Sequence, residues 1–416
     1  MRLSKLPVVL LAIGISLCSK FVIAQTFDDI GNHYANLAEA VFTDSLTLAK
    51  VLDEDIEAFL ETPSEWSLET AKKSWIEARK VYGISEVFRF SHPVVDDWEP
   101  QVNAWPLDEG LIDYVDGDSY YYELGNPVGK ANIVANSSLS FGSSELDLED
   151  LTPDLLASLN EIGGTEANVA TGWHAIEFLL WGQDLNGTGP GAGQRSHTDF
   201  LIGDECTNNN CDRRREYLDA ASNLLITDLE FIVAEWSEGE NNYRSIFDTM
   251  PGEERIRRIL YGIGSLALGE LAGERMKVAL FANSPEDEHD CFSDSTHNTL
   301  YANASGILMA LNGEYQSVSG EQLSGPSLLG WAEENTSNSM ALEQSASAVS
   351  ERLTAIVLAA ENGEAFDQMI APGNKPGADR INKAIDSLVD YTREIELLAA
   401  EMELGTLSPD NAGHDF

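Results

Sequence analysis

One short segment of the chain carries the residues best suited to metal chemistry. Between Trp173 and Trp181 the only polar side chains are His174 and Glu177, so a buried helix is predicted over residues 171–181. Residues three apart on a helix point the same way, and an imidazole nitrogen and a carboxylate oxygen on one face can bind the same cation. The spacing therefore predicts a metal site built on His174 and Glu177.

The same two residues also have a purely structural interpretation. A hydrogen bond between the imidazole and the carboxylate would satisfy both buried groups without a metal, and the spacing alone does not separate the two roles. Two residues do not complete a coordination shell, so a metal site needs ligands from elsewhere in the chain. Gly172, directly before this pair, is expected to allow another group to approach the backbone closely.

The helical motif of zinc peptidases, H-E-x-x-H, does not occur at this helix. Glu177 follows a single histidine, and no second histidine stands four residues after His174. If Glu177 is a ligand, the general base of a peptidase must be another residue; if Glu177 is the base, His174 lacks partner ligands. The pattern therefore favours metal binding over peptide-bond hydrolysis.

Two further histidines lie in an acidic segment, residues 285–297. His289 and His297 could recruit a cation together with the neighbouring carboxylates, although a solvated loop is the expected role of this segment.

Residues 1–24 are predicted to be a signal peptide. Arg2 and Lys5 precede an apolar run over residues 6–18 that is too short to span a bilayer, and a V-x-A pattern ends at Ala24. No later stretch is long and apolar enough to cross a membrane. We therefore expect an exported protein, located in the periplasm or held peripherally at the outer membrane or cell surface.

Three cysteines follow this segment: Cys206, Cys211 and Cys291. An exported protein meets an oxidising environment, which favours disulfides. Cys206 and Cys211 enclose a polar loop that could close on itself, but either could pair with Cys291 instead, and the sequence does not choose.

The charge of the chain excludes one class of partner. Its 416 residues include 25 Lys and Arg against 70 Asp and Glu, which gives a net charge of −45. Such a chain is repelled by phosphate, so nucleic-acid binding is not expected, whereas metal cations remain suitable ligands. Hydrophobic residues make up 43% of the sequence, enough for a substantial core.

Helical periodicity dominates the chain and strand signals are scarce. Besides 171–181, helices are predicted over residues 33–59, 67–90, 212–236, 253–281, 339–360 and 378–402. Irregular segments are predicted over 91–151 and 283–316. We expect an all-α protein of two helical-bundle regions, 25–282 and 283–416, with long irregular loops.

Several blocks of this sequence resemble the imelysin family. Gly172-Trp-His174-Ala-Ile-Glu177 matches the family motif G-x-H-x-x-E. Further blocks that resemble the family occur, in order, at residues 103–114, 204–217, 269–276 and 288–297. The resemblance covers nearly the whole chain, and one imelysin-like unit would span about residues 30–405.

The resemblance implies two helical bundles related by duplication, with a site near their junction that contains His174 and Glu177. It also implies that acidic residues from earlier helices complete the metal shell, and Glu86 and Asp108 are the favoured candidates. Glu109 and Asp113 are weaker ones. Both favoured residues could also have a purely structural role, because Glu86 could pair with Arg89 and Asp108 could cap a helix after Pro106.

Other residues in the resembling blocks are expected to support the site less directly. Glu270 and Arg275 lie on an apolar, glycine-containing helix, where they could surround the metal ligands, although a buried structural ion pair is the expected role. The glycines of this helix are expected to let another helix approach closely.

The resemblance implies two functions for the site. The first is binding of a divalent or trivalent metal ion, iron or zinc, in iron acquisition, with membrane components of iron uptake as partners. The alternative is a metallopeptidase, in which Glu177 would be the catalytic residue, because the family includes proteins described as insulin-cleaving metallopeptidases as well as the iron-regulated protein A type.

Overall fold

The computed structural model describes residues 25–117, 120 and 126–416, so the predicted signal peptide lies outside the described residues. The described chain is all-α apart from two short hairpins, which confirms the predicted fold class. None of its helices combines the length and the apolar composition needed to span a membrane.

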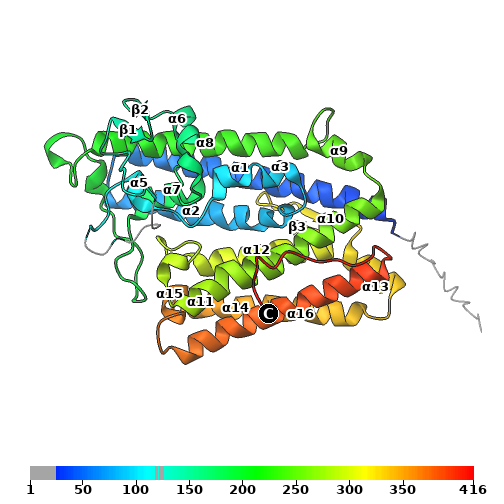
Figure 1. Cartoon of the computed structure of the whole chain (residues 1–416). Helices are drawn as coiled ribbons and strands as arrows, with labels where there is room; N and C mark the ends of the chain where they lie inside the picture. Colours follow the sequence, from blue (N-terminus) through cyan, green and yellow to red (C-terminus); the bar gives the residue numbers. More distant parts are fainter. Residues whose placement is uncertain (1–24, 118–119, 121–125) are drawn as a thin grey trace, which may run out of the picture.

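The long helices form two layers (Figure 1). The first layer contains α1 (Phe27–Glu61), α2 (Glu65–Ser85) and α8 (Cys211–Trp236). The second contains α12 (Thr296–Asn312), α14 (Ser339–Glu361) and α16 (Lys375–Glu401). Helix α1 packs against α2 and α8, α14 packs against α16, and α12 joins the layers because it contacts both α2 and α14. The division at residues 282/283 and the duplication stay predictions.

The remaining elements are short. The helices before α8 are η1 (Glu86–Phe88), α3 (Pro93–Asp96), α4 (Glu99–Asn103), α5 (Glu109–Ile112), α6 (Pro153–Leu159), η2 (Ile162–Gly164), α7 (Gly172–Trp181), η3 (His197–Phe200) and η4 (Gly203–Glu205). Those after it are α9 (Tyr243–Thr249), α10 (Gly252–Ser265), the π-helix η5 (Leu266–Val278), α11 (Ala279–Ala282), η6 (Pro285–Asp287), α13 (Leu328–Asn335) and α15 (Phe366–Met369).

Two antiparallel hairpins complete the fold. Strand β1 (Ser138–Phe141) pairs with β2 (Ser144–Asp147), with Leu139 opposite Leu146. Strand β3 (Glu314–Gln316) pairs with β4 (Gln322–Ser324), with Tyr315 opposite Leu323.

The start of α2 differs from its predicted position. The helix begins at Glu65, because Ser64 is the N-cap residue. The backbone N–H of Ser67 donates to Ser64 Oγ at 3.1 Å, while the backbone N–H of Ser64 donates to Ser67 Oγ at 3.0 Å. This reciprocal cap satisfies two donors at the helix end, so the helix starts two residues before the predicted boundary.

The region 253–281 was predicted as one helix and is a continuous helical run of three parts, α10, η5 and α11. Its glycines face different neighbours: a Cβ atom at Gly262 would lie 3.0 Å from the backbone oxygen of Val87 in η1, and one at Gly264 would meet Pro409 and lie 3.8 Å from Thr392 of α16. A Cβ atom at Gly269 would lie 2.8 Å from the backbone oxygen of Asp410, and one at Gly273 would meet the ring of His414. At Gly269 and Gly273 the close neighbour is therefore the C-terminal segment and not a helix, and glycine is needed there because this segment approaches so closely. Helix α16 packs against the same helical run.

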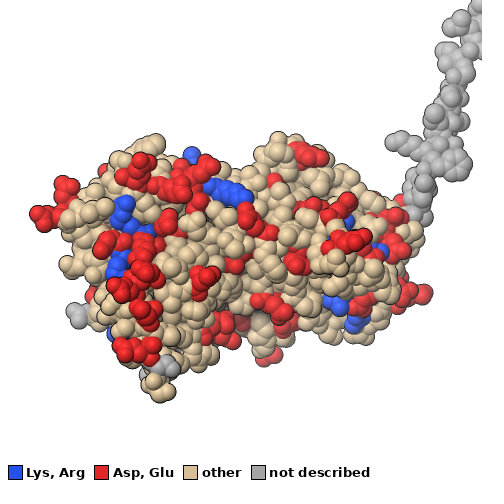
Figure 2. All heavy atoms as spheres, turned by 90° about the horizontal axis from the view of Figure 1, so that it is seen from above, with Lys and Arg blue, Asp and Glu red and all other residues tan. Residues whose placement is uncertain are grey.

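The disulfide is one of the pairings that the sequence left undecided. Cys206 and Cys211 are joined by a disulfide with Cα atoms 6.0 Å apart, and Cys291 is a free thiol. On the face shown in Figure 2, Asp and Glu side chains are far more numerous than those of Lys and Arg.

One buried histidine makes the stability of the fold sensitive to acid. His92 is 0% exposed, with Nδ1 2.8 Å from the Tyr243 hydroxyl and Nε2 3.2 Å from the Tyr34 hydroxyl. Burial, with a smaller effect of Arg258, lowers the pKa of His92 from 6.5 to about 3. The folded state therefore holds a neutral imidazole, while the unfolded chain takes up a proton near pH 6.5.

The stability contributed by His92 should be complete above pH 6.5 and lost as the pH falls towards 3, by roughly 1.4 kcal/mol per pH unit. We expect the unfolding free energy of His92→Gln to depend less on pH than that of the native protein between pH 6.5 and 4.5. Urea denaturation at several pH values measures the difference. Parallel pH profiles for the two proteins would contradict the prediction.

Candidate metal centre

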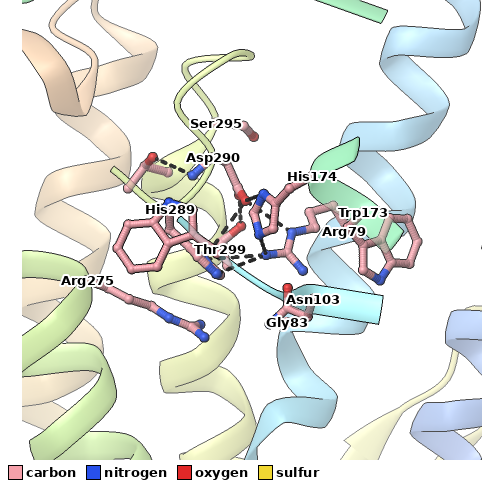
Figure 3. Close-up of polar contacts among 12 residues, drawn as sticks. Arg79, Gly83, Asn103, Trp173, His174, Arg275, His289, Asp290, Ser295 and Thr299 are labelled. Atoms are coloured by element: carbon pink, nitrogen blue, oxygen red, sulfur yellow. Dashed lines mark hydrogen bonds and ion pairs between the residues drawn. The ribbon is translucent and has the colours of Figure 1, made fainter. Parts of the chain in front are cut away.

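Three side chains of metal-ligand type converge where α7 meets the loop before α12 (Figure 3). They are His174, His289 and Asp290, and one ligand atom of each lies within 4.8 Å of the others. In residues 25–117, 120 and 126–416 this is the only group of three or more such side chains at that spacing. All three are at most 1% exposed, so the centre is buried in the protein.

Helix α7 holds His174 rigidly. Every residue of α7 is buried, as the sequence predicted for 171–181. Gly172 starts the helix with a φ of +77°, and a Cβ atom there would collide with the carbonyl group of Val102. The indole N–H of Trp75 donates to the backbone oxygen of Trp173 at 3.0 Å. The close backbone approach expected at Gly172 is thus confirmed, and the start of α7, directly before His174, is held against α4 and α2.

The loop before α12 carries His289 and Asp290 into the interior. The indole N–H of Trp105 donates to the backbone oxygen of Glu288 at 2.7 Å, and its ring meets the His289 ring edge-on, with centroids 5.3 Å apart. The backbone N–H of Asp290 donates to Thr296 Oγ1 at 3.1 Å, and Thr299 Oγ1 donates to the Asp290 carboxylate. The expectation of a solvated loop is therefore wrong at His289, because these contacts fold the segment inwards.

Arg79 of α2 lies at the focus of this group. Its Nε donates to Asp290 Oδ1 at 3.1 Å, and its Nη2 lies 3.2 Å from His174 Nε2 and 3.3 Å from His289 Nε2. Its Nη1 is buried and has no hydrogen-bond partner among the described residues. A guanidinium only donates hydrogen bonds, so His174 Nε2 presents a lone pair to it. The two ring nitrogens of His289 lie 3.3 and 3.4 Å from Nη2, and a neutral imidazole offers a lone pair at one of them. These are the lone pairs that a metal ion would use.

The electrostatic surroundings keep both imidazoles neutral. Burial, followed by the charges of Arg79 and Arg275, lowers the pKa of His174 well below its usual value. Burial and the same two arginines do so for His289. Neutral imidazole is the form of histidine that binds metals.

Glu177 lies behind His174. Glu177 Oε1 accepts from the backbone N–H of Ser293 at 2.9 Å and from Ser293 Oγ at 2.7 Å, while Oε2 lies 3.2 Å from His174 Nδ1. Since Nε2 of this neutral ring accepts from Arg79, Nδ1 carries the proton and donates to Glu177. Carboxylates placed in this way orient metal-binding histidines and fix their tautomer.

The favoured acidic candidates lie outside the group of three. Glu86 forms an ion pair with Arg275 and accepts from Asn303 Nδ2 at 3.0 Å, whereas Arg89 pairs with Glu99 at 3.0 Å. The alternative pairing of Glu86 with Arg89 is therefore wrong. Asp108 stands at the N-cap position of α5, and its carboxylate accepts from Asn126 Nδ2.

The weaker candidates are also not members of the group of three. Asp113 is buried in ion pairs with Arg195 at 2.7 Å and Arg214 at 2.6 Å. Arg275 and Glu270 of η5 form the expected ion pair, 2.8 Å apart. His297 lies in the first turn of α12 and is partly buried, and Glu109 is buried at the start of α5.

Sequence reasoning missed Asp290 and Arg79. Asp290 follows His289 inside a block that resembles the family. If this loop had been predicted to be buried, Asp290 would have been a candidate ligand as well. Arg79 lies within the predicted helix 67–90 and carries no sequence signal, because a helical arginine is normally solvated.

Two imidazoles and one carboxylate suit ferrous iron or zinc. Such a donor set leaves coordination positions open for water or another small molecule. The residues present therefore fit a metal ion of this class.

Comparisons with known proteins agree with this fold. The profile of the imelysin family matches residues 38–395. A crystal structure described as a putative iron-regulated protein A precursor from Parabacteroides distasonis has a TM-score of 0.64 at 16% identity, covering 92% of this chain and 97% of that one. An imelysin-like protein from Psychrobacter arcticum has a TM-score of 0.58 at 13% identity, covering 94% and 100%. No curated protein sequence matches the chain.

Proposed function

The chain belongs to the imelysin family, and we propose that it binds a divalent metal ion through His174, His289 and Asp290. The observation that carries the proposal is the convergence of two neutral imidazoles and a carboxylate on one buried point. Glu177 would hold His174 in the required tautomer. A bound ion would also act as a Lewis acid towards any molecule that it coordinates.

We propose that the role is iron handling in an exported protein, in the periplasm or at the outer membrane. Ferrous iron suits the donor set of two histidines and one carboxylate. The similar fold of the solved structure described as a putative iron-regulated protein A precursor is consistent with this role. Components of iron uptake in the membrane would then be the partners.

Burial of the centre favours ion binding over hydrolysis of peptides. His174, His289 and Asp290 are at most 1% exposed, and Glu177 is 0% exposed. A small ion can reach such a point, but a peptide bond needs a cleft that admits an extended chain beside the metal. Glu177 is also engaged by both donors of Ser293, which makes it less available as a general base.

Metal analysis tests this function directly. Protein purified without chelator should contain, or take up from Fe²⁺ or Zn²⁺, close to one ion per chain, measured by mass spectrometry and anaerobic titration. Loaded protein should leave a denatured polypeptide substrate intact. Failure to bind either ion would overturn the proposal, and metal-dependent cleavage that needs Glu177 would establish the peptidase alternative.

If Glu177 orients His174, its replacement should weaken metal binding without abolishing it. Glu177→Gln keeps the shape of the side chain but replaces the carboxyl group that faces His174 Nδ1 with an amide. Loss of such a supporting carboxylate weakens metal binding about 10- to 100-fold. Titration of Glu177→Gln beside the native protein measures the change, and an affinity equal to native would contradict this role.

A further inference from the structure

A pocket at the C-terminal end of α7 is separate from the metal centre. It encloses about 280 Å³ and is lined by residues 114–116, by Trp181 and by several residues of the loop 182–195. Trp181 is the last residue of α7 and follows His174 along the helix by roughly 10 Å. None of the three proposed metal ligands lines the pocket, so its occupant would be a different molecule from the metal ion.

The guanidinium group of Arg195 is a buried part of the pocket wall. Arg195 lines the pocket and is only 5% exposed. Its Nη1 donates to Asp113 Oδ2 at 2.7 Å, whereas its Nε and Nη2 are buried and have no hydrogen-bond partner among the described residues. The Nε–H and Nη2–H groups lie side by side on one edge of a guanidinium, and such an edge can bind a carboxylate through two parallel hydrogen bonds. This edge of Arg195 is unused.

Gly182 leaves room beside the unused edge. A Cβ atom at Gly182 would lie 3.4 Å from Arg195 Nε and 3.7 Å from Nη2. Gly182 also lines the pocket, and its φ of +70° favours glycine over any residue with a side chain. The two nitrogen atoms without partners therefore face a lining residue that has no side chain to cover them.

The ion pairs around Arg195 do not use these donors. Asp113 Oδ2 accepts from Arg195 Nη1 and also from Arg214 Nε at 2.6 Å, so one carboxylate serves two guanidinium groups. Asp199 Oδ2 lies farther away, 3.7 Å from Nη1. The Tyr114 ring, 4.8 Å from Cζ, stabilises the positive charge but offers no oxygen acceptor to Nε or Nη2. A buried donor without an acceptor is destabilising, so a ligand that supplies one gains affinity from this edge.

The other features of the pocket suit a small and partly apolar molecule. Tyr114 and Trp181 contribute aromatic rings, and Leu185 lines the pocket with 62% of its surface exposed. Among the described lining residues Arg195 is the only basic one, and the only acidic one, Asp116, is exposed to solvent. Sites for drug-sized ligands enclose about 300–1,000 Å³ and combine apolar walls with a few polar groups. This pocket fits that pattern at its lower limit of size.

We propose that the pocket binds a small organic carboxylate with an aromatic or aliphatic body. Its two carboxylate oxygens would accept from Arg195 Nε and Nη2, while its body packs against Trp181 and Leu185. Residues 182–196 contain no helix or strand, so side chains of this loop can shift to admit the carboxylate to the buried edge. The proposal does not depend on the metal centre.

Binding of simple carboxylates to the full protein tests the site. The probes are benzoate, phenylacetate and hexanoate at millimolar concentrations, followed by saturation-transfer NMR and calorimetry, and each is compared with its uncharged amide. At least one acid should bind saturably and about tenfold more tightly than its amide, because an amide offers one acceptor oxygen and no charge.

Arg195→Lys is the decisive variant. It keeps a positive charge near Asp113 but lacks the paired Nε–H and Nη2–H groups, so it should bind the acid roughly 10- to 100-fold more weakly. The matched control is Arg255→Lys. Arg255 is another buried arginine, 3% exposed and paired with Asp28, and it does not line the pocket. Its replacement should leave the affinity for the acid unchanged.

Three results would overturn the proposal: no saturable binding of any of the acids, equal affinity for acid and amide, or native affinity in Arg195→Lys. Should Arg195→Lys be poorly folded by circular dichroism, Leu185→Asp provides a second variant, because Leu185 is exposed and the new charge would repel an anion. Leu185→Asp should weaken binding of the acid but not of the amide. An equal effect on both ligands would also count against recognition of the carboxylate.

Discussion

His289→Ala should lose the metal ion. Removing one of the three ligands leaves an imidazole and a carboxylate, which is fewer than stable zinc or iron sites use. Replacement of supporting residues alone weakens binding about 10- to 100-fold, so loss of a ligand should exceed roughly 100-fold. Titration with Zn²⁺ and with anaerobic Fe²⁺ measures the effect, and His174→Ala should behave in the same way.

The control for this experiment is His197→Ala. His197 is a partly buried histidine of η3 outside the centre, so its loss should leave metal affinity unchanged. Thermal unfolding of the metal-free variants shows whether His289→Ala still folds. A folded His289→Ala protein with native affinity would exclude His289 as a ligand and would leave the centre as a buried polar network.

The second large effect is expected at Arg79. The Arg79–Asp290 ion pair is almost completely buried, with side chains 1% and 0% exposed. Breaking a buried pair by removing one partner is destabilising by about 3 to 5 kcal/mol, because the other charge is left uncompensated. Arg79→Met should therefore lower the unfolding free energy of the metal-free protein by an amount in this range, as measured by urea denaturation.

Metal should restore the stability of Arg79→Met. In the native protein an incoming ion competes with a guanidinium that already contacts His174, His289 and Asp290. Without that competitor a divalent ion compensates Asp290 directly, so we expect tighter binding and a larger metal-induced rise in Tm than in the native protein. Ligand at 100 times its Kd stabilises a folded protein by about 2.7 kcal/mol.

Arg79→Lys is the matched control because it keeps a positive charge near Asp290. It should retain more of the stability of the metal-free protein and gain less from metal than Arg79→Met. If Arg79→Met instead binds metal more weakly than native, then Arg79 positions Asp290 for the ion and does not compete with it.

The helical framework could be predicted from the sequence because it depends on local patterns. The spacing of apolar residues indicates each long helix, and the nearly continuous apolar character of 171–181 indicates that α7 is buried. Boundaries were less certain, because the start of α2 depends on which serine accepts the capping hydrogen bond. The neighbour of Gly269 and Gly273 is the C-terminal segment and not the expected helix, because glycine spacing indicates close approach but not the identity of the neighbour.

Composition and neighbours within one helical turn are enough to predict the fold class, the acidic charge and the helix that carries His174 and Glu177. The rest of the centre depends on tertiary contacts. His289 and Asp290 follow His174 by more than 100 residues, and Arg79 precedes it by 95. No local pattern reports which distant segments meet. The loop before α12 is buried because Trp105, Thr296 and Thr299 bind it, and that burial brings His289 and Asp290 next to His174.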